Sequence, residues 1–119
     1  MTNLALRRGD VVVAALSGDF GKPRPAVVVQ SDLFNPTHAS VVVAPVSSDI
    51  TGFDLFRVPV APLVSNGLRA PSEIMIDKAG AARRDRIRKR IGRLTPAQMR
   101  LVDAGLRIWL DLPSTKSNL

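Results

Sequence analysis

The stretch DVVVAAL, Asp10 to Leu16, is an almost unbroken run of apolar and β-branched residues. A short run of this kind is typical of a strand that is buried on both faces. The stretch PAVVVQ, Pro25 to Gln30, has the same character and follows after a short loop. The two stretches therefore predict an antiparallel pair of strands in a β-rich fold.

Short strands separated by turn residues continue along the chain. The turn signals are Asn35-Pro36 and Asn66-Gly67. Pro45 lies near the end of the third predicted strand and points to an edge or a bulge there, because proline has no N–H for a sheet ladder. We expect the later strands over Ser40–Val46, Phe53–Val60, Ser72–Asp77 and Arg86–Leu94.

The C-terminal part of the chain changes to a helical period. Thr95 is a predicted N-cap, Pro96 occupies the favoured first position, and Gln98 completes a capping-box pattern. An apolar stripe follows at helical spacing, and we expect all of it, including the tryptophan, in the core: Met99, Val102, Leu106, Trp109 and Leu110. The helix should run to about Leu112, where Pro113 stops it.

These elements predict one domain over residues 1–119, mainly β with a C-terminal helix. The expected architecture is a small, SH3-like or barrel-like antiparallel sheet. The ordered core should cover about 7–112, with a loose tail at 113–119.

Composition narrows the class of protein. A chain of 119 residues that is 45% hydrophobic is long enough for one core. The absence of cysteine excludes disulfides and thiolate chemistry and is compatible with a reducing cytoplasm. No apolar run approaches the roughly 18 residues of a membrane span. We therefore expect a soluble, cytoplasmic protein.

The charge is strongly positive. Seventeen Lys and Arg against ten Asp and Glu give a net charge of +7. Eight of the seventeen cations fall between Arg83 and Arg100, with Asp85 as the one acid inside their main run. Such a cluster favours a polyanionic partner, above all nucleic acid, although a solvated charged face stays an alternative.

Several common motifs are excluded. The segment GDFGKP, Gly18 to Pro23, is too short for a phosphate-binding loop, and Pro23 replaces the hydroxyl residue after the lysine. His38 is the only histidine, which excludes a histidine pair, and it lies beside a predicted turn. Tyrosine is absent, so stacking surfaces for bases are scarce, and Phe20 is the loop aromatic that could supply one.

The candidate site is distributed over the ends of three predicted strands. Lys22 and Arg24 enter the second strand, Ser47 and Ser48 leave the third, and Asp77 and Lys78 end the short strand before the basic run. If these ends meet, they gather cations, hydroxyls and a carboxylate, which can grip a phosphodiester. The alternative is that Arg24 pairs locally with Asp19 or Asp32 and that the serines only form a turn.

These segments of the sequence resemble those of a known family. RRGDVVVAAL followed by KPRPAVVVQSD, Arg7 to Asp32, is similar to the opening of the MazF/PemK/Kid family of toxin endoribonucleases. VVVAPVSSDI resembles that family's third strand, and the segment from Ser72 to Leu110 resembles its closing strand, basic turn and helix. The resemblance runs from about Arg7 to Leu112.

The resemblance implies a fold shared with plasmid gyrase poisons and a two-fold homodimer. It also implies sequence-specific cleavage of single-stranded RNA, often mRNA, at short motifs without a metal or other cofactor. The nucleophile would be the RNA's own 2′-OH, and the products a 2′,3′-cyclic phosphate and a 5′-OH. Arg24 matches the family's catalytic arginine, and Ser47 stands where a threonine is usual. Asp77 occupies an acidic strand-end position that contributes to the site in some members.

The first loop departs from the family pattern. It is about four residues shorter than in many members and lacks their glutamate and glutamine, so Asp19 is its remaining carboxylate. We expect Lys22, Asp19, Phe20, Ser48, Asp77 and Lys78 to contact RNA. The general acid and base stay open.

Two other functions remain compatible with the sequence: a gyrase-poisoning toxin of the same fold, and a basic β-barrel that binds RNA without cutting it. A toxin also implies an antitoxin. The charge of +7 predicts an acidic antitoxin segment that lies across the cationic cleft.

Overall fold

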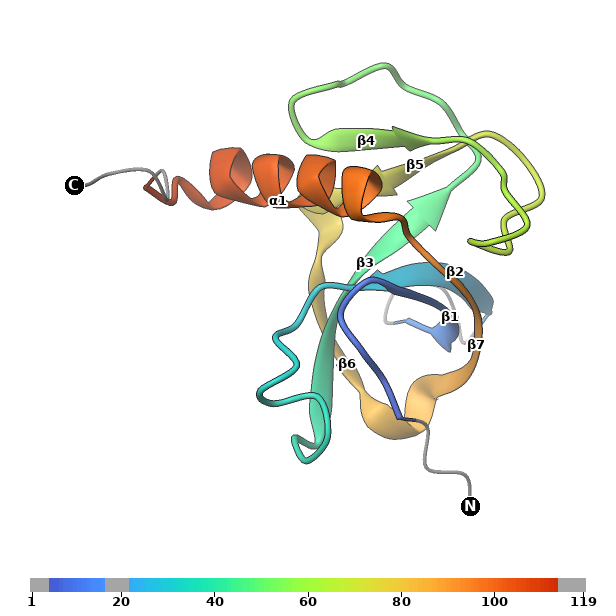
Figure 1. Ribbon diagram of the computed structural model, residues 1–119, viewed down its shortest axis with the longest axis vertical. Helices are drawn as coiled ribbons and strands as arrows, with labels where there is room; N and C mark the ends of the chain where they lie inside the picture. Colours follow the sequence, from blue (N-terminus) through green and yellow to red (C-terminus); the bar gives the residue numbers. More distant parts are fainter. Residues whose placement is uncertain (1–4, 17–21, 114–119) are drawn as a thin grey trace.

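The protein is built on one seven-stranded sheet with the order β4-β5-β3-β2-β1-β7, in which β6 also pairs with β3 (Figure 1). The computed structural model describes residues 5–16 and 22–113. Every strand pairing in it is antiparallel. The elements in chain order are β1 (Asp10–Ala15), β2 (Pro23–Val28), β3 (Ser40–Ser47), β4 (Arg57–Val60), β5 (Ser72–Met75), the 3-10 turn η1 (Ile76–Lys78), β6 (Gly80–Arg83), the 3-10 turn η2 (Arg84–Arg86), β7 (Ile87–Arg93) and α1 (Pro96–Leu110).

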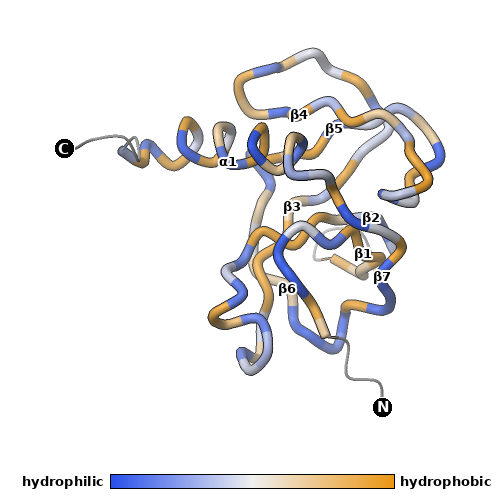
Figure 2. The backbone as a smooth tube through the Cα atoms, viewed as in Figure 1, coloured by the Kyte–Doolittle hydropathy of each residue, from blue (hydrophilic) through white to orange (hydrophobic). Residues whose placement is uncertain are grey.

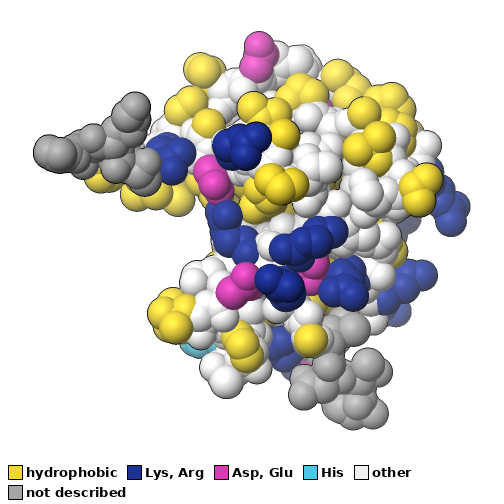
Figure 3. Space-filling view, viewed as in Figure 1, with side chains coloured by type: hydrophobic (Ala, Val, Ile, Leu, Met, Phe, Trp, Pro, Cys, Tyr) yellow, Lys and Arg dark blue, Asp and Glu magenta, His cyan; other side chains and the backbone are white. Residues whose placement is uncertain are grey.

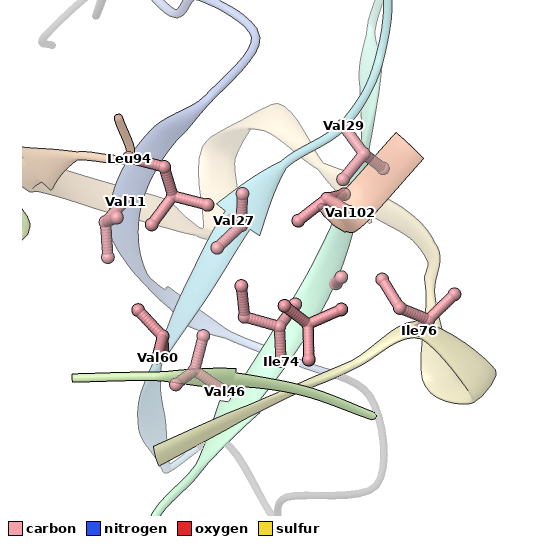
Figure 4. Packing of buried hydrophobic residues seen from close by; sticks show 11 residues of the cluster. Val11, Val27, Val29, Val46, Val60, Ile74, Ile76, Leu94 and Val102 are labelled. Carbon is pink, nitrogen blue, oxygen red and sulfur yellow. The ribbon is translucent and has the colours of Figure 1, made fainter. Parts of the chain in front are cut away.

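The central strands are covered on both faces, which explains their consecutive valines. Val11 and Val27 point into one hydrophobic cluster, where side chains from the sheet and from α1 converge (Figure 4). Val12 and Val28, one position further along each strand, point into a second cluster on the opposite face. The prediction of strands buried on both faces is therefore confirmed. Full burial of each such side chain contributes about 1.5–3 kcal/mol.

β3 joins the two parts of the sheet. On one edge it pairs with β2; on the other it pairs first with β6, over Ser40 to Val43, and then with β5, at Val46 and Ser47. Pro45 falls in the gap between these two partners, where a missing N–H costs no ladder bond. This arrangement places Ser47 where the β4–β5 pair meets the rest of the sheet (Figure 1).

The terminal helix has the predicted start. The Thr95 side chain accepts a hydrogen bond from the backbone N–H of Gln98, whose side chain in turn accepts from the N–H of Thr95. Val102 is fully buried, and Gly105 allows close approach to Ile76. The helix ends at Leu110, two residues before the predicted end.

The second half of α1 corrects one expectation. Trp109 was predicted in the core, but 48% of it is exposed, and Leu110 is exposed as well. The reason is geometric, because this part of the helix extends past the sheet and its apolar side has little to cover it (Figures 1 and 2). The Trp109 ring lies against Phe56, with 5.6 Å between ring centroids.

Three further elements differ from the predictions. Residues 53–56 form a turn rather than the start of β4, because the N–H groups of Phe56 and Arg57 both bond to the Phe53 carbonyl. β5 ends at Met75, and η1 replaces its predicted end. β6, with the weak strand sequence GAAR, was not predicted and exists through its pairing with β3. The predicted tail beyond Pro113 lies outside the described residues.

Candidate functional site

A cavity of about 500 Å³ opens at the junction of β1, β2, β3 and β7 with the β4–β5 connection. It brings together Arg24, Ser47 and Ser48, three of the residues selected from the sequence. The other lining residues are Val13, Pro25, Val46, Asp49, Gly67, Leu68, Arg69, Ala70, Ser72, Lys89 and Ile91.

Arg24 is held at the edge of the cavity by the second strand. It pairs with Ala14 of β1, and the prolines on either side of it restrict the backbone dihedral φ there. The side chain is half-buried, and its Nε is shielded from solvent. A guanidinium in such a place interacts with an anion more strongly than one in open water, because the local dielectric constant is lower.

Ser47 ends β3 and begins the loop that lines the cavity with Ser48 and Asp49. Its Oγ accepts a hydrogen bond of 3.0 Å from the backbone N–H of Asp49. A hydroxyl that already accepts can still donate its proton, so Ser47 is oriented to give its O–H to a phosphate oxygen. Ser48 and Asp49 are exposed next to it.

A buried carboxylate fixes the far end of the same loop. Glu73 on β5 is the cross-strand partner of Ser47, and the residue is 1% exposed. It accepts hydrogen bonds from the N–H and hydroxyl of Thr51 and from the N–H of Gly52, at 2.9 to 3.0 Å. Burial raises the pKa of Glu73, but these hydrogen bonds and nearby Arg57 outweigh it, so the pKa lies below its ordinary value. The loop is thus held in place on both sides of Ser48 and Asp49.

Another wall is formed by residues 67–70 of the β4–β5 connection, which packs on the backbone of β7. The buried Asn66 side chain accepts from the N–H groups of Leu63 and Leu68 and donates to the Ala61 carbonyl. The approach to β7 is close because both partners are glycines. A Cβ on Gly67 would overlap the Ile91 carbonyl, and one on Gly92 would overlap Asn66.

This wall adds a cation that the sequence did not single out. Arg69 lines the cavity, and Lys89 on β7, opposite Val13 of β1, lines it as well. With Arg24, the cavity presents three cations and one carboxylate, Asp49, among the residues that the structure describes. The local charge therefore suits an anionic ligand.

Most other cations of the basic run have local partners. Arg83 pairs with Asp85, Arg84 bonds to the carbonyls of His38 and Asn35, and Asp10 accepts from Arg93 and lies 3.6 Å from Arg90. Figure 3 shows the resulting band of basic side chains with acidic ones between them. This part of the run forms a charged face, one of the two alternatives that the sequence left open.

None of the other predicted site residues that the structure describes lines the cavity. Asp77 holds Arg57 through two hydrogen bonds, of 2.7 and 3.1 Å, and this contact raises the pKa of Arg57. Lys78 follows it and is exposed. Lys22 is exposed just before β2. Asp19 and Phe20 lie outside the described residues.

Sequence reasoning missed Asp49, Arg69 and Lys89 as lining residues. The signals were present but weak: Asn66-Gly67 marked a turn just before Arg69, and the alternation of Ile87, Lys89 and Ile91 placed the lysine on the side of the two isoleucines.

The arrangement can bind a phosphodiester and stabilise added negative charge on it. Arg24 offers paired N–H donors, Ser47 a hydroxyl donor, and Arg69 and Lys89 further positive charge. No helix in the described part of the chain is long and apolar enough to cross a membrane.

Comparisons with known proteins agree with this fold. Residues 7–110 match the family described as PemK-like, MazF-like toxin of type II toxin-antitoxin system. A probable endoribonuclease MazF of Mycolicibacterium smegmatis is 38% identical over 90% of this chain and 98% of its own length. The Mycobacterium tuberculosis toxin MazF-mt6 superposes with a TM-score of 0.77 at 25% identity, over 88% of this chain and 99% of that one. A mycobacterial endoribonuclease solved with its cognate antitoxin has a TM-score of 0.73 at 24% identity, over 92% and 97% of the two chains, and supports the fold.

Proposed function

This chain belongs to the PemK-like, MazF-like toxin family of type II toxin–antitoxin systems, and we propose that it is the toxin of such a module, an endoribonuclease that cuts single-stranded RNA. The observation that carries the proposal is the cavity in which Arg24 and Ser47 lie beside two further cations. These two residues come from different strands, and the fold places both on one cavity.

The reaction that suits the site uses the substrate as its own nucleophile. The 2′-oxygen of RNA attacks the adjacent phosphorus, its proton leaves to a base, and the P–O5′ bond breaks as the 5′-oxygen takes up a proton. The products are a 2′,3′-cyclic phosphate and a 5′-OH. Arg24 stabilises the extra negative charge on the phosphorane oxygens, and Ser47 orients the phosphate through its free proton. Arg69 and Lys89 hold the backbone by charge.

The proposed reaction needs no metal, and three results test it. Incubation with mixed-sequence single-stranded RNA should give 5′-OH and cyclic phosphate ends, at the same rate with and without EDTA. A single 2′-deoxy substitution at the cleavage position should abolish cutting. Cutting of the deoxy substrate would contradict attack by the 2′-OH.

Gyrase poisoning is the second candidate, because Trp109 is half-exposed on a helix that extends past the sheet. Exposed tryptophans are common at the centres of protein interfaces. A supercoiling assay with purified gyrase, run beside the RNA assay, separates the candidates. Loss of supercoiling without RNA cleavage would replace our proposal, and RNA binding without cleavage would indicate a non-catalytic RNA-binding protein.

We propose an acidic antitoxin as the protein partner, acting in the cytoplasm where mRNA is available. An acidic segment across Arg24, Arg69 and Lys89 would compete with RNA for the same cations. Inhibition should therefore be competitive and weaken with added salt. Inhibition that does not depend on RNA concentration would place the antitoxin elsewhere.

We propose a homodimer, as in the family. The support is the exposed apolar surface at the C-terminal end of α1, where Ile108, Trp109 and Leu110 are each about half-exposed. Sedimentation should give a mass of twice 12.8 kDa at micromolar concentration. A monomer at that concentration would contradict the proposal.

A further inference from the structure

The cavity is built for more than a phosphate. Phosphate binding needs only donors and positive charge, but a large share of this cavity is apolar, formed by Val13, Pro25, Val46, Leu68 and Ile91. Its volume of about 500 Å³ falls within the roughly 300–1,000 Å³ typical of small-molecule sites. On the premise of the proposed function, the apolar part has one fitting occupant in an RNA chain, a base next to the scissile phosphate.

Recognition of one base over another depends on hydrogen bonds, because stacking tolerates every base. No aromatic side chain lines the cavity in the part of the chain that the structure describes, so stacking on a ring is not available there. The cations Arg24, Arg69 and Lys89 can only donate. They match the phosphate, which can only accept, and cannot select a base by its N–H groups.

Asp49 is the group in the cavity with the opposite chemistry. It is the one carboxylate among the described lining residues, and no ion pair or hydrogen bond to its side chain is found within residues 5–16 and 22–113. Its backbone N–H is used by Ser47, which fixes where the residue lies. Ser72 gives its proton to the Ala70 carbonyl, so it is already committed to a partner.

A carboxylate cannot bond a phosphodiester and repels it. The donors that RNA offers are the 2′-OH and the N–H groups of the bases. We propose that Asp49 is a specificity-determining residue that accepts hydrogen bonds from the donor edge of an RNA base held in the cavity.

The chemistry of the four bases ranks them against this acceptor. Guanine presents two adjacent donors, N1–H and N2–H, which match the two oxygens of a carboxylate. Cytosine and adenine present one amino group beside a ring acceptor. Uracil presents one N–H between two carbonyl oxygens, which a carboxylate repels. The cavity should therefore prefer guanine and reject uracil most strongly.

The test is a single-turnover cleavage assay on RNAs in which each position around the cut is varied in turn. The wild type should favour guanine over uracil at one position. Asp49→Ala should reduce that preference by about 5- to 150-fold, the range expected for a bidentate base contact, and leave the other positions unchanged. Asp49→Asn keeps one acceptor and gains a donor, so it should raise the relative cleavage of uracil there. Both variants keep the backbone N–H that holds Ser47.

Asp54→Ala is the matched control, since this carboxylate lies on the same β3–β4 connection but does not line the cavity. It should keep the wild-type preferences. A base preference that Asp49→Ala leaves intact at every position would overturn the inference, as would an equal loss of cleavage for all RNAs. Neither outcome contradicts the proposed function. A wild-type protein that cuts no RNA would contradict both the proposed function and the role of Asp49.

Discussion

Replacing Gly92 with alanine should detach the wall of the cavity from β7. A Cβ at this position would lie 2.5 Å from the carbonyl oxygen and 2.6 Å from the Cα of Asn66. Both atoms belong to the backbone, so no side-chain rotation can relieve the contact, and the segment that contains Asn66 has to move.

The structure gives the size of the effect. Overpacking of this kind costs about 1–3 kcal/mol. Movement of the segment also threatens the 2.7 Å hydrogen bond from the Arg93 N–H to the Ser65 carbonyl, a net contribution of about 1 kcal/mol. We expect Gly92→Ala to lower the free energy of unfolding by about 2–4 kcal/mol in total. Displacement of Arg69 with the segment should also raise the KM for RNA.

Gly80→Ala is the control for urea unfolding. Gly80 also lies in a strand and, like Gly92, has no positive φ, but nothing lies within 4 Å of its would-be Cβ. Its free energy of unfolding should match the wild type or rise slightly, since alanine restricts the unfolded chain. If the free energies of unfolding of Gly92→Ala and Gly80→Ala differ by less than about 0.5 kcal/mol, the inferred close approach of the two backbones is wrong.

Substitutions at two other residues test how the loop after β3 is held and whether the hydroxyl at its start is used. Glu73→Gln removes a charged acceptor of three hydrogen bonds and should cost about 2–3 kcal/mol at neutral pH. Because the folded-state pKa of Glu73 is below its ordinary 4.5, its contribution to the free energy of unfolding is present above pH 4.5 and is lost as the pH falls through the folded-state pKa. Urea unfolding of the variant should therefore depend less steeply on pH below 4.5 than that of the wild type. An identical pH dependence would contradict the role of Glu73 in holding the loop. Ser47→Ala should lower kcat by about 10²–10³ while Ser47→Thr keeps most of it, and equal rates for the two variants would show that the hydroxyl is not used.

The sequence predicted the central part of the fold because its signals there are local. Consecutive valines in β1 and β2 indicate strands buried on both faces, and Thr95, Pro96 and Gln98 define the helix start through contacts within one turn. β6 could not be predicted in this way. Its Gly-Ala sequence has little strand propensity, and only its pairing with β3 makes it a strand.

In the site, too, residues marked by local patterns were predicted and residues placed by long-range contacts were not. Arg24 and Ser47 were found because each stands at the end of a recognisable strand, in a pattern that resembles a known family. Asp77 shows the limit of that approach, since its place at a strand end did not reveal that Arg57, twenty residues away, takes both of its oxygens. Arg69 reaches the cavity only because two glycines let distant backbone segments touch, which no local pattern records.

The rate of RNA cleavage by Arg24→Ala, measured under single turnover, tests the central claim most directly. Arg88→Ala is the matched control, because this exposed cation on β7 does not line the cavity. We expect Arg24→Ala to unfold at the wild-type urea concentration and to cut RNA about 10²–10³-fold more slowly, while Arg88→Ala cuts at nearly the wild-type rate. Cleavage by Arg24→Ala at the wild-type rate would contradict the assignment of this cavity as the active site.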